Sequence, residues 1–194
     1  MVGCRLEWRC GEVWEVGGGW KSEYLHHGEY FQTDLPGDRE EYKNLWTGEC
    51  FTLEKDEYWV GGDHFQHGNH VFSVSDPRLK IELSAKAVQN WQQLWLLVGR
   101  LVYYDGGTLR DAITDNVLFA ADSFRICAAG CLIKVGGELR FTDGVREDIP
   151  LGEIGPNEFV RPLRVSETEY SIKVGRRATG YRYFLLDTAR WTCI

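Results

Sequence analysis

The sequence predicts an α+β domain, a mostly antiparallel sheet with one long helix at about residues 85–98 and a short helix at about residues 122–129. Three observations lead to this fold class. They are an apolar pattern of helical period, a hairpin with two glycines in its turn, and strand-like runs along most of the remaining chain.

The long helix is predicted from the residues that follow Ser84, whose hydroxyl can cap the first backbone N–H groups of a helix. Apolar residues then recur at intervals of three and four, at Val88, Trp91, Leu94, Trp95 and Val98. Gly99 follows in the position of a left-handed C-terminal cap. We therefore expect Trp91, Trp95 and Val98 to be buried, with Phe124, against a sheet that contains residues 101–103 and 132–135.

The short helix is predicted to begin at Asp122, to carry Phe124 and Cys127 on one face and to end at Gly130. Strands are predicted at residues 5–8, 12–16, 46–53, 100–104, 117–119, 132–135, 138–141, 159–165, 170–174 and 181–186. The pair around Gly136-Gly137 is a hairpin, because two glycines permit the positive φ angles of a primed turn. No internal repeat is recognised. From the length of 194 residues and a hydrophobic content of 43%, we expect a single domain over residues 1–194, with residues 1–70 as a candidate irregular N-terminal extension.

The order of these elements between residues 81 and 135 matches a known family. An I-x-L-S pattern leads into the helix, a G-x-L-V-Y strand begins at Gly99, and the string L-F-A-A-D-S-F precedes Gly130 and Leu132. This stretch resembles the betaherpesvirus family named after the twenty-second gene of the cytomegalovirus unique short region, within the SUKH superfamily. The resemblance implies a SUKH-like fold and a viral tegument or early protein that antagonises host innate antiviral defence. A toxin-immunity protein of the same superfamily is the alternative that it implies.

Composition limits the classes of function. The chain has 22 basic and 29 acidic residues and a net charge of −7, which disfavours nonspecific binding to nucleic acid or to anionic membranes. No apolar run reaches the ~18 to 20 residues that span a bilayer, and the first ten residues lack the apolar core of a signal peptide. We therefore expect an intracellular protein, in the host cytoplasm or nucleus if it is viral.

Two groups of residues raise the alternative of a small cysteine or zinc hydrolase. His64, His67 and His70 are nitrogen donors of the kind that zinc prefers, but Gly68 and Asn69 would break a helix that aligned them. Cys50, followed by His70 and Asp76, has the order of a nucleophilic triad, although such an order arises easily among six cysteines and five histidines. We expect no cofactor, no metal and no catalytic residue, and we expect the cysteines to be reduced, with Cys127 and Cys131 buried.

The expected function is binding of another protein, a host protein or a toxin with a basic surface. Two regions combine charge, aromatic side chains and irregular backbone: the acidic-aromatic segment 34–59 and the polar connection 142–157. The candidate contact residues are Tyr42, Trp46, Glu54, Asp56, Glu57, Tyr58, Trp59, Arg146, Glu147 and Asp148. The sequence leaves the identity of the partner and the oligomeric state open.

Overall fold

The computed structural model describes residues 5–9, 12–16, 23–26 and 30–194, with side chains from residue 30 onward except for Gln92. Strands dominate. After an N-terminal hairpin of β1 (Arg5–Arg9) and β2 (Glu12–Val16), twenty strands form five four-stranded antiparallel sheets. Each sheet is a meander in which neighbouring strands are also neighbours in the chain.

The five sheets follow one another along the chain. The first contains β3 (Glu23–His26), β4 (Tyr30–Leu35), β5 (Arg39–Asn44) and β6 (Cys50–Leu53), and the second contains β7 (Glu57–Gly61), β8 (His64–His67), β9 (His70–Ser73) and β10 (Lys80–Glu82). The third contains β11 (Leu94–Leu97), β12 (Arg100–Asp105), β13 (Thr108–Asp111) and β14 (Val117–Ala120). The fourth contains β15 (Ser123–Cys127), β16 (Gly130–Val135), β17 (Glu138–Thr142) and β18 (Ile149–Glu153), and the fifth contains β19 (Phe159–Arg164), β20 (Glu169–Arg176), β21 (Gly180–Asp187) and β22 (Thr192–Cys193).

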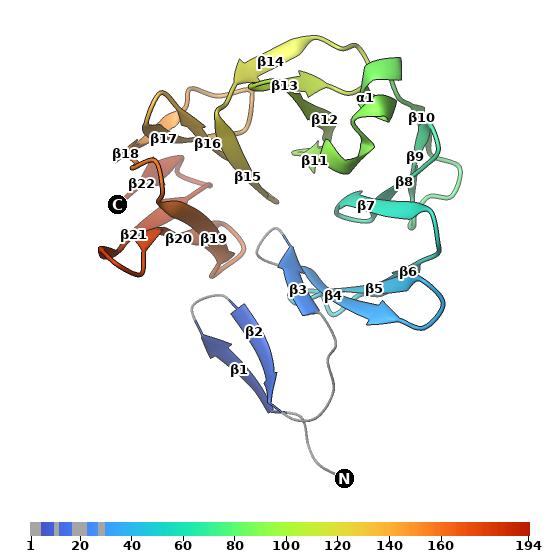
Figure 1. The fold of residues 1–194 in the computed structure, drawn as a ribbon, viewed down its shortest axis with the longest axis horizontal. Coiled ribbons are helices and arrows are strands. Elements are labelled where there is room, and N and C mark those ends of the chain that lie inside the picture. The colour runs from blue at the N-terminus through green and yellow to red at the C-terminus, as the bar shows by residue number, and fades with distance from the viewer. Residues whose placement is uncertain (1–4, 10–11, 17–22, 27–29) are drawn as a thin grey trace.

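Figure 1 shows these sheets arranged around a common centre, with the first strand of each sheet innermost and the fourth outermost. The inner strands touch one another, since β11 contacts both β7 and β15, and β15 contacts β19. Small four-stranded meanders repeated radially in this way define a five-bladed β-propeller arrangement. We refer to the sheets in chain order as blades 1 to 5.

The α+β prediction, and with it the SUKH-like fold that the resemblance implied, is therefore wrong. The long helix is reduced to α1 (Ala85–Gln89), followed by a single 3₁₀ turn, η1 (Trp91–Gln93). Ser84 does cap α1, accepting a hydrogen bond from the Ala87 N–H at 3.2 Å. The helix ends at Asn90, and the apolar run that follows is strand β11.

The pattern misled because a short apolar run has the same appearance in a buried strand as in a helix. Val98 and Gly99 both have positive φ and form the two-residue turn between β11 and β12. Gly99 thus has the positive φ that a left-handed helix cap requires, but it lies in a hairpin turn rather than at the end of a helix. Val98 is exposed and Trp91 is partly exposed, so two of the three residues predicted to be buried there are not.

The helix predicted at about 122–129 is also wrong, because its residues form strand β15 and the turn to β16. Asp122 does not cap a helix; its carboxylate accepts a hydrogen bond from the Gly136 N–H at 2.8 Å. The hairpin itself is confirmed: Gly136 and Gly137 have φ of 58° and 88° and join β16 to β17. The helix was predicted because Phe124 and Cys127 fit its period, whereas the structure pairs this segment with β16 along its whole length.

The chain has a structural repeat that the sequence analysis did not recognise. The first strands of the blades begin at residues 23, 57, 94, 123 and 159, at intervals of 34, 37, 29 and 36 residues. Residues 30–70, considered as part of an irregular extension, form strands β4 to β9 of two regular blades. The irregular spacing and the differing side chains hide a repeat that lies in the turns and the backbone.

The apolar core is divided among the contacts between successive blades. One cluster joins blades 2 and 3 around Val60, Val71 and Tyr103, and a second joins blades 3 and 4 around Val102, Leu109 and Ile133. A third joins blades 4 and 5 around Leu132, Phe141, Tyr170, Ile172 and Leu186. Each blade is therefore stabilised mainly by its neighbours.

Cys127 and Cys131 belong to these clusters, and both are buried, as predicted. Burial raises the pKa of the Cys131 thiol, with a smaller contribution from nearby Cys127. Cys50 and Cys193 are also free thiols, whereas Cys4 and Cys10 lie outside the described residues. Among the helices of the described residues, none is long and apolar enough to cross a bilayer.

Close packing in blade 4 gives a test of the fold. A Cβ atom at Gly130 would lie 2.6 Å from the Phe141 ring and 2.6 Å from the Thr142 carbonyl oxygen, whereas one at Gly155 would come no nearer than 3.4 Å to Glu158. Neither glycine has a positive φ. We expect Gly130→Ala to lower the free energy of unfolding by about 1–3 kcal/mol through overpacking and Gly155→Ala to change it much less. Chemical denaturation measures both, and equal effects of the two substitutions would contradict this packing.

Candidate functional site

The acidic-aromatic segment 34–59 does not form one surface. Tyr42 is only 4% exposed and stacks between Phe51 and Trp59, with ring centroids 5.5 and 5.1 Å away. Burial, together with a hydrogen bond from the Tyr42 hydroxyl to Glu40, raises the pKa of Tyr42. The structure therefore places Tyr42 and Trp59 in the contact between blades 1 and 2.

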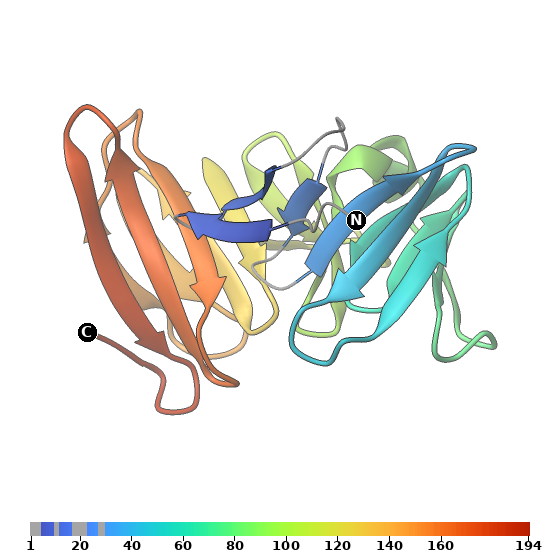
Figure 2. The same cartoon turned by 90° about the horizontal axis from the view of Figure 1, so that it is seen from below.

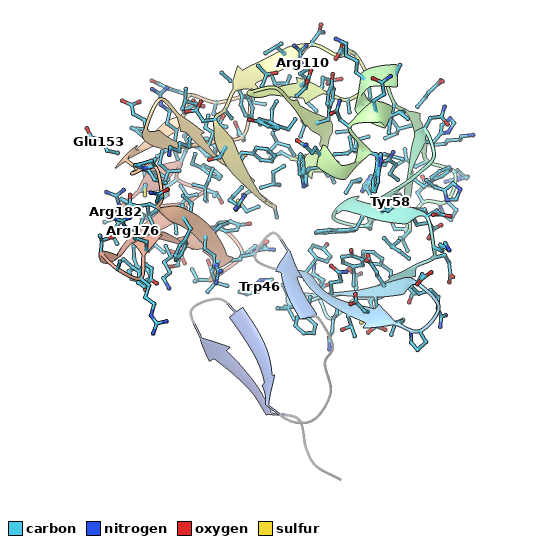
Figure 3. The ribbon with its side chains drawn as sticks, viewed as in Figure 1. Trp46, Tyr58, Arg110, Glu153, Arg176 and Arg182 are labelled. Atoms are coloured by element: carbon cyan, nitrogen blue, oxygen red, sulfur yellow. The ribbon has the colours of Figure 1, made fainter. Side chains whose placement is uncertain are left out.

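Trp46 and Tyr58, in contrast, are partly exposed. The Tyr58 ring lies 4.2 Å from the ring of Trp91. Trp46, in the turn between β5 and β6, lies under the Arg164 guanidinium at 5.2 Å, so it joins blade 1 to blade 5 (Figure 3). Both aromatic rings already have a partner within the molecule.

Glu54, Asp56 and Glu57 lie at the connection between blades 1 and 2. The Glu57 carboxylate accepts a hydrogen bond from the Glu54 N–H at 2.8 Å, which fixes this turn. Glu54 and Asp56 are exposed, whereas Glu57 is half-buried. They make an acidic rim that we call the blade 1 rim.

The polar connection 142–157 is more ordered than predicted, because its middle is strand β18. Arg146 lies with its guanidinium 3.4 Å from the centre of the Trp191 ring and pairs with the Asp143 carboxylate at 2.7 Å. The Glu147 carbonyl accepts a hydrogen bond from the Trp191 indole N–H at 2.7 Å. These contacts join blade 4 to blade 5, so Arg146 has an internal role.

A cavity of about 430 Å³ opens beside this connection, on the outer strands of blade 4. Its walls are formed by Glu138, Leu139, Arg140, Glu147, Asp148, Pro150, Gly152 and Glu153, and we call it the carboxylate pocket. The β17–β18 pairing shifts by one residue between Leu139 and Arg140, and Gly152 has φ of 97°. Such a bulge bends the edge of the sheet locally, and Pro150 is compatible with an outermost strand.

The pocket is strongly acidic. Glu138 and Glu153 are directly opposite each other on β17 and β18, an arrangement of like charges that costs stability. Arg140 is the one cation in the lining, and it is bound by Glu138 at 2.5 Å, a hydrogen bond that raises the pKa of Arg140. The carboxylates of Glu147, Asp148 and Glu153 form no ion pair with another described residue. Figure 3 shows Glu153 at the outer edge of the molecule.

The structure thus brings together two predicted contact residues, Glu147 and Asp148, with three that the sequence analysis missed. Glu138, Arg140 and Glu153 lie on strands whose register sets the pocket. The only signal in the sequence was the alternation of charged and apolar residues in β17, which does not reveal what lies opposite. β18 was interpreted as part of a long polar connection over residues 142–157.

The candidate metal ligands and nucleophile are not gathered into a site. His67 and His70 are opposite each other on β8 and β9, whereas His64 is three residues from His67 along an extended strand and pairs with Asp63 at 2.8 Å. Within the ranges that the structure describes, no three His, Cys, Asp or Glu side chains are placed to hold a metal ion. Cys50 lies in blade 1 with its thiol 3.7 Å from the Gly48 carbonyl, while His70 is in blade 2.

Comparisons with known proteins add little to this description. No protein-family model matches the sequence, and no characterised protein matches it. Among solved structures, the chain is similar to the β-propeller domain of Cps50 (Swd1) from Myceliophteria thermophila. The identity is 8%, the match covers 86% of this chain and 69% of that chain, and the TM-score is 0.33. At this level of similarity, the blade topology described above remains the basis for the fold class.

The Asp143 carboxylate gives a prediction about pH. Burial favours its neutral form, but hydrogen bonds from the Arg146 and Val145 N–H groups and from the Arg146 guanidinium outweigh burial and lower the pKa of Asp143 below its ordinary value of 3.8. A carboxylate whose pKa is lower in the folded than in the unfolded chain stabilises the fold at pH values above its unfolded pKa. This stability is lost as the pH falls through the folded pKa.

We therefore expect Asp143→Asn to lower the free energy of unfolding at neutral pH and to weaken its decline below about pH 4. Denaturant unfolding at a series of pH values measures both effects. Glu147→Gln removes a neighbouring carboxylate that accepts none of these hydrogen bonds, and it is the matched control. An identical pH dependence in wild type and Asp143→Asn would contradict the assignment.

Proposed function

We propose that this protein is a non-catalytic binding module that accepts a lysine or arginine side chain of a partner protein in the carboxylate pocket of blade 4. One observation carries the proposal: an open cavity whose lining has four carboxylates and a single cation that is already paired. A cation entering the pocket would offset the repulsion between Glu138 and Glu153.

The shape of the pocket supports a side chain as its ligand. Exposed Pro150 supplies apolar surface for the methylene stem of a long basic residue, and the carboxylates surround the place of its charged end. Because the carboxylates are exposed to solvent, the interaction would depend on salt and would contribute to association rate and specificity more than to affinity.

A titration with a defined probe tests the proposal. The probe is an acetylated and amidated glycine peptide with one central arginine, and the same peptide with norleucine is its control. We expect the arginine peptide to shift the backbone amide NMR signals of Leu139 and Gly152, and the norleucine peptide to leave them unchanged.

Two variants with equal changes in charge distinguish the pocket from the blade 1 rim. The pocket variant carries Glu147→Gln, Asp148→Asn and Glu153→Gln, and the rim variant carries Glu54→Gln, Asp56→Asn and Glu57→Gln. Three lost contacts with exposed carboxylates predict about tenfold weaker binding for the pocket variant and a small, salt-dependent change for the rim variant. An equal loss in both variants would show that net charge, and not the pocket, binds the probe.

A further inference from the structure

Blade 5 differs from the other blades in its outermost strand. Strand β22 has two residues, whereas its neighbour β21 has eight. In the other four sheets, the outer strand has three to five residues beside a neighbour of four to six. Strand β22 pairs with β21 at Leu186 and Asp187 only, and Ile194 adds backbone bonds to Leu185. Among the described residues, no strand pairs with the outer edge of β21 from residue 180 to residue 184.

The direction of the backbone groups on this edge follows from one hydrogen-bonded pair. The Leu185 N–H donates to the Ile194 carbonyl at 2.9 Å, and the Ile194 N–H donates to the Leu185 carbonyl at 3.0 Å. The N–H and C=O groups of Leu185 therefore point away from β20. Because this direction alternates along a strand, the N–H and C=O groups of Tyr183 and Tyr181 point outward as well. Such a row of backbone groups is a template for another strand.

The side chains next to this edge offer apolar contacts. Tyr181, Tyr183 and Leu185 share one face of the sheet, and all three are exposed, Tyr183 to 60%. Tyr181 is held in place, because its ring lies 5.4 Å from the ring of Phe159 and 3.9 Å from the Lys173 ammonium group. Figure 2, seen from below, shows β21 at the outer edge of blade 5, with the N-terminal hairpin on the side of β19.

Charge indicates which kind of segment would bind. Residues 159–194 contain seven basic and three acidic residues, a net charge of +4 in a chain of net −7. Arg176 and Arg177 are exposed at the turn between β20 and β21, beside the open edge, and neither forms an ion pair with a described residue. Figure 3 labels Arg176 at this turn. Arg182 is on the opposite face of the strand, where it binds the Glu153 carbonyl and the Glu158 carboxylate.

We propose that the outer edge of β21 binds an extended segment of a partner protein as an added antiparallel strand, in line with β22. Its side chains on one face would pack on Tyr181 and Tyr183, and acidic residues at its C-terminal end would lie beside Arg176 and Arg177. The partner segment is acidic, because a basic segment would be repelled by Arg176 and Arg177. This site is on a different blade from the carboxylate pocket and takes a ligand of opposite charge, so it does not depend on the function proposed above.

The experiment uses the full chain and the acetylated, amidated peptide Thr-Val-Thr-Val-Thr-Glu-Glu. Hydrogen exchange reports on the edge directly: the Tyr181 and Tyr183 amides should exchange freely in the protein alone and become protected with the peptide. The Arg182 amide faces β20 and should be protected in both states. Replacing both glutamates of the peptide by lysine should abolish the protection of the two tyrosine amides.

Methylated peptides separate strand addition from simple side-chain contact. N-methylation of alternate residues removes either the N–H groups that face β21 or those that face solvent. We expect one methylated peptide to bind about tenfold more weakly or worse, and the other to bind nearly as well as the parent peptide. Equal effects of the two methylated peptides would overturn the proposal.

Protein variants complete the test. Tyr183→Pro removes an outward N–H group, while Tyr183→Ala retains it, so the proline variant should bind the peptide more weakly than the alanine variant. If the proline variant fails to fold, the methylated peptides still decide the question. Protection of the Tyr181 and Tyr183 amides without peptide would also overturn the proposal. Protection at every dilution would mean that the chain itself covers the edge. Protection only at high protein concentration would mean that a second copy of the chain covers it.

Discussion

The structure depends on the need of each small sheet to bury its faces against the next sheet. A four-stranded meander has two faces and cannot cover either of them itself. The three apolar clusters lie between blades 2 and 3, 3 and 4, and 4 and 5, and an aromatic stack around Tyr42 and Trp59 does the same for blades 1 and 2. Trp46 and Arg164 then connect blade 1 to blade 5. The radial arrangement follows from this succession of paired faces.

The same succession determines where charge gathers. The faces between successive blades are filled by apolar side chains, so charged side chains gather at the outer strands and the turns. Blade 4 presents carboxylates there, and neighbouring blade 5 presents arginines, with Arg182 reaching the Glu153 carbonyl and Glu158 across the boundary. Two surfaces of opposite charge therefore lie on adjacent blades.

Turns were easier to predict from the sequence than the helices and strands that they connect. Gly136-Gly137 and Gly99 have the positive φ that glycine suggested, and Ser84 caps a helix as expected. The helix predictions were wrong because the apolar positions in residues 94–98 and 124–127 fit both helical and strand periods, and pairing with β12 and β16 made both segments strands. A repeat was present in the strings Gly106-Gly107-x-Leu109-Arg110 and Gly136-Gly137-x-Leu139-Arg140, which occupy the same turn in blades 3 and 4. Burial of Tyr42 and the opposition of Glu138 and Glu153 depend on packing and register, which the sequence does not display.

The meander connectivity has a consequence for how the chain folds. All-β proteins usually fold slowly, because their strand pairs join distant parts of the chain and large loops must close first. Every strand that the structure describes pairs only with strands adjacent in the chain, and several of the connecting turns, such as those at residues 98–99 and 136–137, have two residues. Each blade can therefore form from local contacts as it leaves the ribosome, and only the docking of one blade on the next requires contacts between separate units.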